Sequence, residues 1–397
     1  MSVYVPRLYH KVFDKKTGKT QLFFSPVIKK FVFREMVGEG HQFVTRDETG
    51  KDYDRQTFET LMPFIYYKNM DLWGKLPLHI DEHVFDKETM KKNRQVFELK
   101  PHMIADRSPR IQVFPLLESQ PGRTRLRFPE DAFRMTDRME FINVDTNTVN
   151  EDLTRQFTDV LERAGFEFPA QLVAGRVSIL KPFDEGFFMV DAKGAVYHVK
   201  RAKGQPIVVK TPIPPDLDVR YIKVAENKKR EIYGMLLTGD GGLYLISYDN
   251  YRLIKLPLEN YNPNTMDFKL LINPLCRTAV YSDDHTIYAV AMDTRYRPIA
   301  QYQRVMFSGR RTLTDRIYEA IFPFYIKTTD KTSSYLRFDV IRNGPPALIG
   351  IAFSLLFAIV VMYKRKLGQR KHWPDLAIIM FTGLYGLIGV AIVRPEP

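Results

Sequence analysis

The hydrophobic positions of this chain fall into two contrasting patterns. Between residues 177 and 305, short runs rich in Val, Ile, Tyr and Phe alternate with Gly, Asp, Asn or Pro. Such runs are typical of β-strands separated by turns. After residue 344, two long stretches, 345–363 and 376–393, are almost entirely apolar. The first pattern predicts a β-rich domain, and the second predicts two transmembrane helices.

The runs between residues 177 and 305 repeat in groups of four. The first group reads VSILKPF, GFFMVDA, AVYHVKR and PIVVK; the second begins with VRYIKVA and the third with DFKLLIN. The third run of each group contains a tyrosine, Tyr197, Tyr244 or Tyr288, at spacings of 47 and 44 residues. These spacings are close to the roughly 40–45-residue period of four-stranded propeller blades. We therefore expect propeller-like stacked sheets, with an ordinary sandwich of successive hairpins as the alternative.

A weaker fourth copy of the pattern, FRMTDRMEFINVD, lies upstream of the first group. Asp137 occupies its turn, and Phe141 takes the place of the tyrosine. A predicted helix separates this copy from the first group. Thr148 and Glu151 have the spacing of a capping box, apolar residues then recur at helical intervals, and Gly165 is placed to end the helix.

The first 130 residues read as a mixed α/β region. LFFSPVIKKFVFREM predicts strands interrupted at Pro26, and DRQTFETLMPFIYYKNMDLWG predicts a short helix that begins near Asp54. No low-complexity linker follows. We therefore predict an N-terminal region at 1–130 and a β-repeat region at 131–340, which contains the helix at 148–165.

Each apolar stretch near the end of the chain has the length of a membrane span. At a rise of about 1.5 Å per residue, 18–20 residues approach a hydrocarbon core of about 30 Å. Two buried core helices of a soluble domain are the alternative, but neither stretch has a polar face. The second stretch also contains three regularly spaced glycines, which predict a close-packing helix face or reflect the general use of glycine in membrane helices: Gly383, Gly386 and Gly389.

The connector at 364–375 is strongly basic. Before Asp375 it carries five cations and no acid: Lys364, Arg365, Lys366, Arg370 and Lys371. Short basic loops stay in the cytoplasm, so the connector is expected inside and the large N-terminal portion outside. The opening MSVYVPRLYHKVF lacks the features of a signal peptide. We therefore expect a signal anchor upstream of this sequence; the alternative is a cytoplasmic domain that breaks the charge rule.

The composition excludes some classes of protein. Of the 397 residues, 45% are hydrophobic, which fits a packed domain, and the net charge of +13 would suit an anionic partner. Basic residues are spread along the chain without a nucleic-acid-binding motif, so we expect no nucleic-acid partner. The single cysteine, Cys276, excludes a disulfide scaffold.

No motif specifies an active site. The chain contains no G-x-S-x-G elbow and no glycine-rich nucleotide loop that precedes a helix. Asp184 and Glu185, in KPFDEGFF, form a carboxylate pair that would suit acid–base chemistry. The pair fits better as the turn of the first hairpin of the first repeat, and we keep it as a weak polar-site candidate. We expect no catalytic residue, no cofactor and no metal.

Several longer phrases carry a resemblance. LMPFIYYKNMDLWGKLPLHID, FRMTDRMEFINVDTNTVN, AGFEFPA and KPFDEGFFMVDAKG, together with the apolar end of the chain, resemble an uncharacterised family of bacterial membrane-anchored proteins. Members of that family are often encoded beside the ATPase and permease of an ABC-type transporter, and they tend to begin with a hydrophobic segment that this sequence lacks. The resemblance assigns no activity.

Together these features predict a non-enzymatic binding or accessory subunit. We expect it in the bacterial inner membrane, with its large domain extracytoplasmic, and with the lipid bilayer and ABC-type permease and ATPase subunits as partners. One alternative is an envelope enzyme that acts on an anionic polymer. The other is a cytoplasmic-facing sensor or scaffold, which would follow from the inverted topology.

Overall fold

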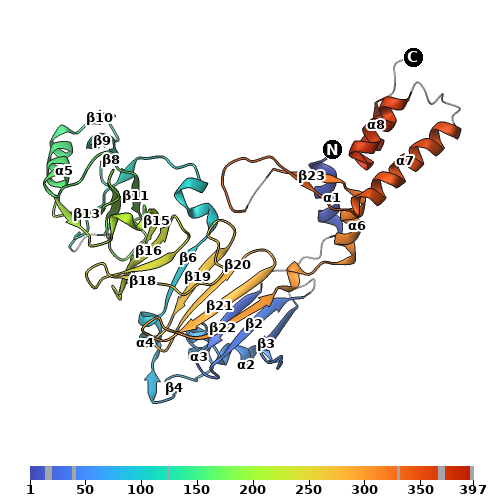
Figure 1. Cartoon of the computed structure of the whole chain (residues 1–397). Coiled ribbons are helices and arrows are strands. Elements are labelled where there is room, and N and C mark those ends of the chain that lie inside the picture. The colour runs from blue at the N-terminus through green and yellow to red at the C-terminus, as the bar shows by residue number, and fades with distance from the viewer. Residues whose placement is uncertain (14–19, 38–41, 123–124, 329–330, 365–371, 394–397) are drawn as a thin grey trace. The chain divides into compact units, whose positions relative to one another are not determined.

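The computed structural model describes residues 1–13, 20–37, 42–122, 125–328, 331–364 and 372–393. The chain divides into two compact units. The β-sheet unit comprises Gln21–Arg34 and Thr45–Arg304, and the helical unit comprises Met1–Thr20, Glu35–Val44 and Val305–Pro397. In the described residues the protein is mainly β with several helices, and none of its sheets closes into a barrel (Figure 1).

Four antiparallel sheets follow one another along the β-sheet unit. The first contains β7 (Phe114–Pro115), β8 (Asp131–Met135), β9 (Met139–Asn143) and β10 (Thr148–Val149). The second contains β11 (Leu172–Gly175), β12 (Phe187–Val190), β13 (Val196–Ala202) and β14 (Gln205–Lys210). The third contains β15 (Val219–Val224), β16 (Ile232–Thr238), β17 (Leu243–Ser247) and β18 (Leu253–Lys255). The fourth contains β19 (Asp267–Ile272), β20 (Arg277–Ser282), β21 (Thr286–Met292) and β22 (Pro298–Val305), with β6 (Gln95–Leu99) beside β19.

The predicted groups of strands correspond to these sheets. The second and third groups coincide with the third and fourth sheets, and the weaker copy around Phe141 forms β8 and β9 of the first sheet. One predicted strand is wrong: VSILKPF (177–183) contains no strand, and β11 begins the second sheet instead. The reason is that Val177 and Leu180 face solvent while the side chain of Lys181 is fully buried.

Neighbouring sheets share hydrophobic cores. The rings of Phe133 and Phe187, 5.1 Å apart, join the first sheet to the second, and those of Phe188 and Tyr233, 5.8 Å apart, join the second to the third. A third core joins the third sheet to the fourth. Fully burying one large apolar side chain contributes about 1.5–3 kcal/mol. The second and third sheets are therefore stabilised from both faces.

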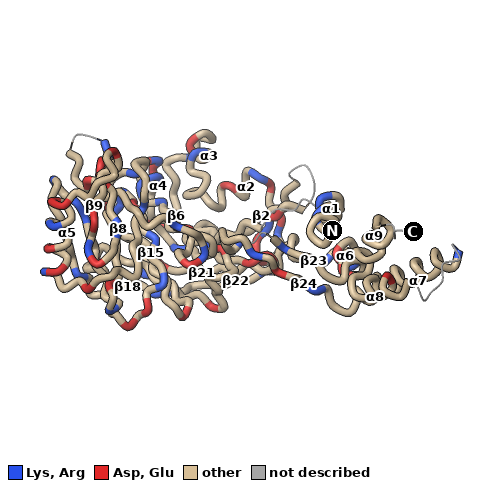
Figure 2. Tube along the Cα trace, turned by 90° about the horizontal axis from the view of Figure 1, so that it is seen from above, with Lys and Arg blue, Asp and Glu red and all other residues tan. Residues whose placement is uncertain are grey.

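The N-terminal residues are built into the same stack. A three-stranded sheet contains β1 (Gln21–Ser25), β2 (Lys30–Met36) and β3 (Phe43–Asp47), and Pro26 lies between β1 and β2 as predicted. This sheet packs on the fourth sheet, since Phe31 stacks on Tyr302 with ring centroids 5.6 Å apart. The strands β2 and β9 mark opposite ends of the stack (Figures 1 and 2).

Short helices and one hairpin complete the β-sheet unit: α2 (Arg55–Thr60), α3 (Tyr67–Leu72), β4 (Leu78–Ile80), β5 (His83–Phe85), α4 (Lys87–Asn93) and α5 (Glu151–Arg163). The predicted start near Asp54 is confirmed, because its side chain caps α2. The predicted cap of α5 is wrong: Thr148 lies in β10, and Asn150 accepts the hydrogen bond from the helix N-terminus. Gly165, with φ of 83°, follows the end of α5 as predicted.

The helical unit contains α1 (Tyr4–Phe13), α6 (Leu313–Ile321), β23 (Phe324–Lys327), β24 (Asp339–Arg342), α7 (Ala347–Lys364), α8 (Trp373–Thr382) and α9 (Leu384–Ile392). Within the described residues, α7 alone is long and apolar enough to cross a membrane. The second predicted span is not one helix. Gly383, with φ of 58°, separates α8 from α9, and a Cβ on Gly386 would lie 2.9 Å from backbone atoms of Ile378 and Ile379. Because those residues lie seven and eight positions earlier, α9 turns back against α8.

Candidate functional site

Asp184, the first of the two candidate carboxylates, is buried and belongs to an ion-pair cluster. Its Oδ1 lies 2.5 Å from Nζ of Lys181, and the same Nζ lies 2.7 Å from Oε1 of Glu226, just after β15. Burial raises the pKa of Asp184 and Glu226, although Lys181 opposes the shift. One buried ammonium is therefore shared by two carboxylates, and it ties a loop of the second sheet to the third sheet.

Glu185 takes part in a second set of contacts. Its carboxylate accepts hydrogen bonds from Lys200 in β13 and from the hydroxyl of Tyr248, which follows β17. Its backbone oxygen lies 2.6 Å from Nε2 of His198, and the Nδ1 of that ring lies 3.0 Å from the hydroxyl of Tyr251. Burial, helped by the charge of Lys200, lowers the pKa of His198 to about 3. His198 is therefore neutral at physiological pH.

Stacked rings fill the space around these groups. Tyr233 stacks on Tyr248 and on Tyr251 with centroids 3.7 and 5.1 Å apart, and Phe188 stacks on His198 at 4.2 Å. Asp184 and Glu185 are each 3% exposed. The pair lies in the connection between β11 and β12, and it is not an open acid–base site: the two carboxylates join adjacent sheets.

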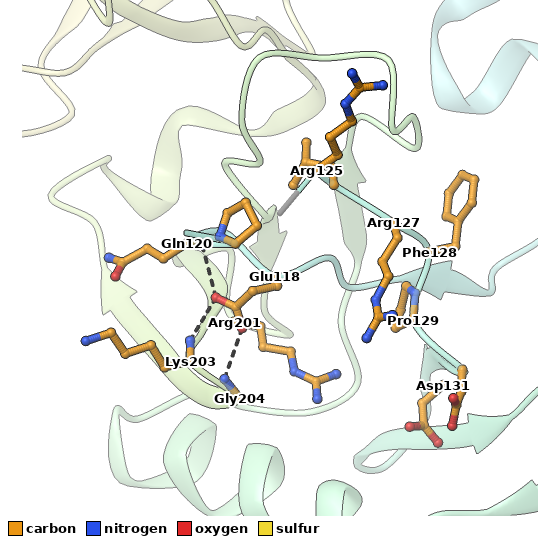
Figure 3. A pocket seen from close by; sticks show the side chains of 13 residues that line it. Glu118, Gln120, Arg125, Arg127, Phe128, Pro129, Asp131, Arg201, Lys203 and Gly204 are labelled. Atoms are coloured by element: carbon orange, nitrogen blue, oxygen red, sulfur yellow. Dashed lines mark hydrogen bonds between the residues drawn. The ribbon is translucent and has the colours of Figure 1, made fainter. Parts of the chain in front are cut away.

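An open cleft lies beside the first and second sheets (Figure 3). Its volume is about 540 Å³, within the range of small-molecule sites. One side comes from residues 118–121 and 125–131, before and at the start of β8, and the other from the end of β13 and the turn that follows it. The lining residues are Glu118, Gln120, Pro121, Arg125, Leu126, Arg127, Phe128, Pro129, Glu130, Asp131, Arg201, Lys203 and Gly204.

Glu118 holds the two sides of the cleft together. Its carboxylate accepts backbone N–H groups from Lys203 at 2.8 Å, Gly204 at 3.0 Å and Gln120 at 3.0 Å (Figure 3). Partial burial would raise the pKa of Glu118, but these three donors outweigh it and leave the pKa below its usual value. Glu118 is therefore an ionised structural clamp, with both oxygens engaged by the protein backbone.

Four cationic side chains line the same cleft: Arg125, Arg127, Arg201 and Lys203. Their charged groups form no ion pair within the part of the chain that the structure describes. Two other carboxylates, Glu130 and Asp131, also line the cleft. Asp131 accepts a hydrogen bond from Asn150 at 3.3 Å. The arrangement therefore suits a ligand that brings its own negative charge, with Leu126 and Phe128 offering apolar contact.

This cleft was missed in the sequence analysis. Its one local signal is the alternation of arginines in RTRLRF (123–128). The other side of the cleft lies more than 70 residues away in the sequence, so no local pattern connects the two.

The remaining candidates lie in the helical unit. Lys364 is the last residue of α7, whereas Arg365, Lys366, Arg370 and Lys371 lie outside the described residues. Gly386 and Gly389 lie three residues apart in α9, and Gly383 precedes this helix. Gly383 lies at the break between helices, Gly386 packs against α8, and a Cβ on Gly389 would have no neighbour within 4 Å.

Residues 21–292 match the family described as a domain of unknown function (DUF4857). The chain belongs to this family. The matched stretch holds the cleft and the Asp184–Glu185 contacts and ends at the last residue of β21, so α6–α9 lie beyond it. No curated protein matches the chain. Family membership thus covers the candidate sites without assigning them a role.

Proposed function

We propose that the protein is a non-enzymatic, membrane-anchored binding subunit of the bacterial inner membrane, and that it serves an ABC-type transport complex. Its stacked sheets, a propeller-like arrangement, would present the cleft of Arg125, Arg127, Arg201 and Lys203 to an anionic ligand or partner. The observation that carries the proposal is this group of four cations without internal ion pairs, gathered on a cleft of ligand size.

The surface of α7 supports the anchor. Its 18 residues extend about 27 Å, close to the roughly 30 Å of a hydrocarbon core. Leu348, Phe353 and Phe357 are all at least 60% exposed, whereas the core helix of a soluble domain would bury such side chains. The α8–α9 pair, with 10 and 9 residues, is too short in each helix to cross alone. We therefore place one full span at α7, followed by a short helical pair.

The orientation follows from charge. Lys364 and the basic residues after it would hold the C-terminal end of α7 in the cytoplasm, which leaves the β-sheet unit outside. A cysteine at position 368, in a Cys276→Ser background, tests this orientation with a membrane-impermeant maleimide. Protection in intact cells and labelling after permeabilisation are expected. Labelling in intact cells would favour the inverted, cytoplasmic-facing scaffold.

The partnership with a transporter is tested by purification in mild detergent followed by mass spectrometry. Co-purification of a permease and an ATPase of the ABC type is expected. Recovery of this chain alone, from membranes that contain both subunits, would contradict the accessory role.

Charge reversal tests the cleft. The double variant Arg201→Glu/Lys203→Glu should weaken the binding of dextran sulfate at least tenfold, since unit charges about 4 Å apart interact by about 1–4 kcal/mol near a surface. Neutral dextran should not bind either protein. The matched control Lys68→Glu/Lys92→Glu makes the same change of charge on exposed residues of α3 and α4. Equal loss in both double variants would indicate a general charge effect and refute a specific cleft.

The alternative of an envelope enzyme draws on the three carboxylates that line the same cleft. Glu118 is clamped by backbone donors and its pKa is lowered, so it does not suit a general acid. Glu130 and Asp131 remain. Turnover of an anionic polymer that is lost in Glu130→Gln and Asp131→Asn, with binding retained, would favour this alternative.

A further inference from the structure

The N-terminal helix α1 exposes a continuous apolar stripe. Tyr4, Leu8 and Val12 recur every four residues, so they lie on one face, and they are 75, 61 and 63% exposed. Arg7 and Lys11 flank the stripe on one side. An apolar stripe bordered by cations is typical of helices that lie in a membrane interface.

The opposite face of α1 is fixed to α6. The ring of Tyr9 lies 5.4 Å from that of Tyr318, and its hydroxyl donates a hydrogen bond to the backbone oxygen of Thr314 at 2.9 Å. The ring of His10 lies 4.3 Å from Tyr318. At the edge of the stripe, Arg7 donates a hydrogen bond to Thr328, which follows β23 rather than belonging to α6. The exposure of Tyr4, Leu8 and Val12 is therefore a consequence of firm packing on the other side.

Helix α6 is in turn held against the first turns of α7. A Cβ on Gly350 would lie 2.1 Å from the backbone oxygen of Ala320, so the two helices touch through backbone atoms. Phe322 stacks on Tyr385 of α9 with centroids 5.7 Å apart. Gly350 is the fourth residue of α7, which places α6, and α1 with it, at the N-terminal end of the apolar helix.

Helix α6 also exposes apolar side chains. Leu313 and Ile317, one turn apart, are 72 and 42% exposed. Arg316 lies between them in the sequence, and Figure 2 shows basic residues along α1. The exposed apolar surface of α1 is thus part of a unit whose main helix is itself apolar and exposed.

We infer that α1 lies in the boundary between lipid headgroups and acyl chains, with Tyr4, Leu8 and Val12 inserted and with Arg7 and Lys11 against anionic headgroups. This inference rests on the proposed membrane anchor, because α7 sets the depth at which α1 meets the bilayer. The continuity of α1, α6 and α7 selects lipid as the occupant of the stripe. A helix of another protein or a second copy of this chain would bury the same side chains without contact with lipid.

Site-directed spin labelling of the full chain in nanodiscs tests the inference. A nitroxide is placed at Leu8 in a Cys276→Ser background, with matched labels at Phe353 on α7 and at Leu72, an exposed apolar residue of α3. Collisions with oxygen report lipid contact, and collisions with a water-soluble nickel chelate report water contact. The label at Leu8 is expected to favour oxygen, at a shallower depth than Phe353, whereas the label at Leu72 favours nickel.

The outcomes separate the two proposals. Leu8 in water with Phe353 in lipid would overturn the placement of α1 and leave the anchor intact. Phe353 in water would overturn the anchor itself. A label at Leu8 that neither reagent reaches would indicate a protein partner and overturn the lipid assignment. The same measurement in nanodiscs with and without phosphatidylglycerol tests the role of the two cations. If the anionic lipid increases the depth of the Leu8 label in the bilayer, Arg7→Gln/Lys11→Gln should abolish that increase.

Discussion

The buried ammonium of Lys181 offers the sharpest test of how the stacked sheets hold together. Lys181→Met keeps most of the side-chain volume and removes the charge. Asp184 and Glu226, both buried, then lose the cation that lies 2.5 and 2.7 Å from them. Breaking a buried ion pair from one side typically costs about 3–5 kcal/mol.

Protonation limits the size of this loss. A buried carboxyl that has lost its cation binds a proton instead of remaining charged. For a carboxyl with an ordinary pKa near 4, protonation costs about 4 kcal/mol of free energy at pH 7 and about 1.4 kcal/mol at pH 5. The pKa of both carboxyls is already raised in the folded protein, and the substitution raises it further. A carboxyl with a raised folded pKa loses stabilising free energy as the pH rises above its unfolded value. The destabilisation should therefore be about 3–5 kcal/mol at pH 7 and about 2–3 kcal/mol smaller at pH 5.

Urea unfolding of the full chain in detergent measures this effect. A Trp373→Phe background leaves Trp73 as the reporter of the β-sheet unit, because the chain has two tryptophans. Lys193→Met, which breaks an exposed pair with Glu167, is the matched control and should change little. A loss at pH 7 no larger than that of the control, or an equal loss at pH 5, would refute the reasoning.

Three further perturbations test other parts of the β-sheet unit. In thermal unfolding, Gly186→Ala should destabilise the protein by more than about 2 kcal/mol, because φ of Gly186 is 70° and the new Cβ would lie 2.2 Å from the backbone oxygen of Val199. The control Gly204→Ala should cost only about 1 kcal/mol, because φ is 78° but the new Cβ would have no neighbour within 4 Å. Since the pKa of His198 is about 3 when folded and about 6.5 when unfolded, stability should fall as pH drops below about 6.5, and His198→Gln should flatten this part of an acid-unfolding profile. Asn150→Ala should cost about 1 kcal/mol in urea unfolding by removing the cap of α5, and a neutral result would refute that role.

The sheets were predictable from the sequence because their signals are local. A strand rich in Val, Ile and Tyr and the Gly- or Asp-containing turn that follows it can be recognised within about ten residues of sequence. The single misplaced strand, 177–183, has the same apolar composition but carries Lys181. Burial of that residue depends on Glu226, 45 residues away, and no periodicity carries this information.

The site was less predictable for the same reason. Asp184 and Glu185 were noticed as a pair, but their burial is set by Lys200, Tyr248 and other partners on different strands. The cleft joins two segments that meet only after the first and second sheets pack. In the helical unit, the equal spacing of the glycines suggested one face, whereas the positive φ of Gly383 breaks the helix.

The distribution of charge links these observations to function. Two cations between the sheets are matched: Lys181 faces two carboxylates and Lys200 pairs with Glu185. Such pairing offsets the cost of desolvating a buried charge. The four cations of the cleft are brought together by the backbone around Glu118, whose ionised carboxylate accepts three backbone N–H groups. Within the described residues these four cations form no ion pair with the three carboxylates that also line the cleft, and an anion would relieve their mutual repulsion. We therefore assign binding to this cleft and structural support to the buried pairs.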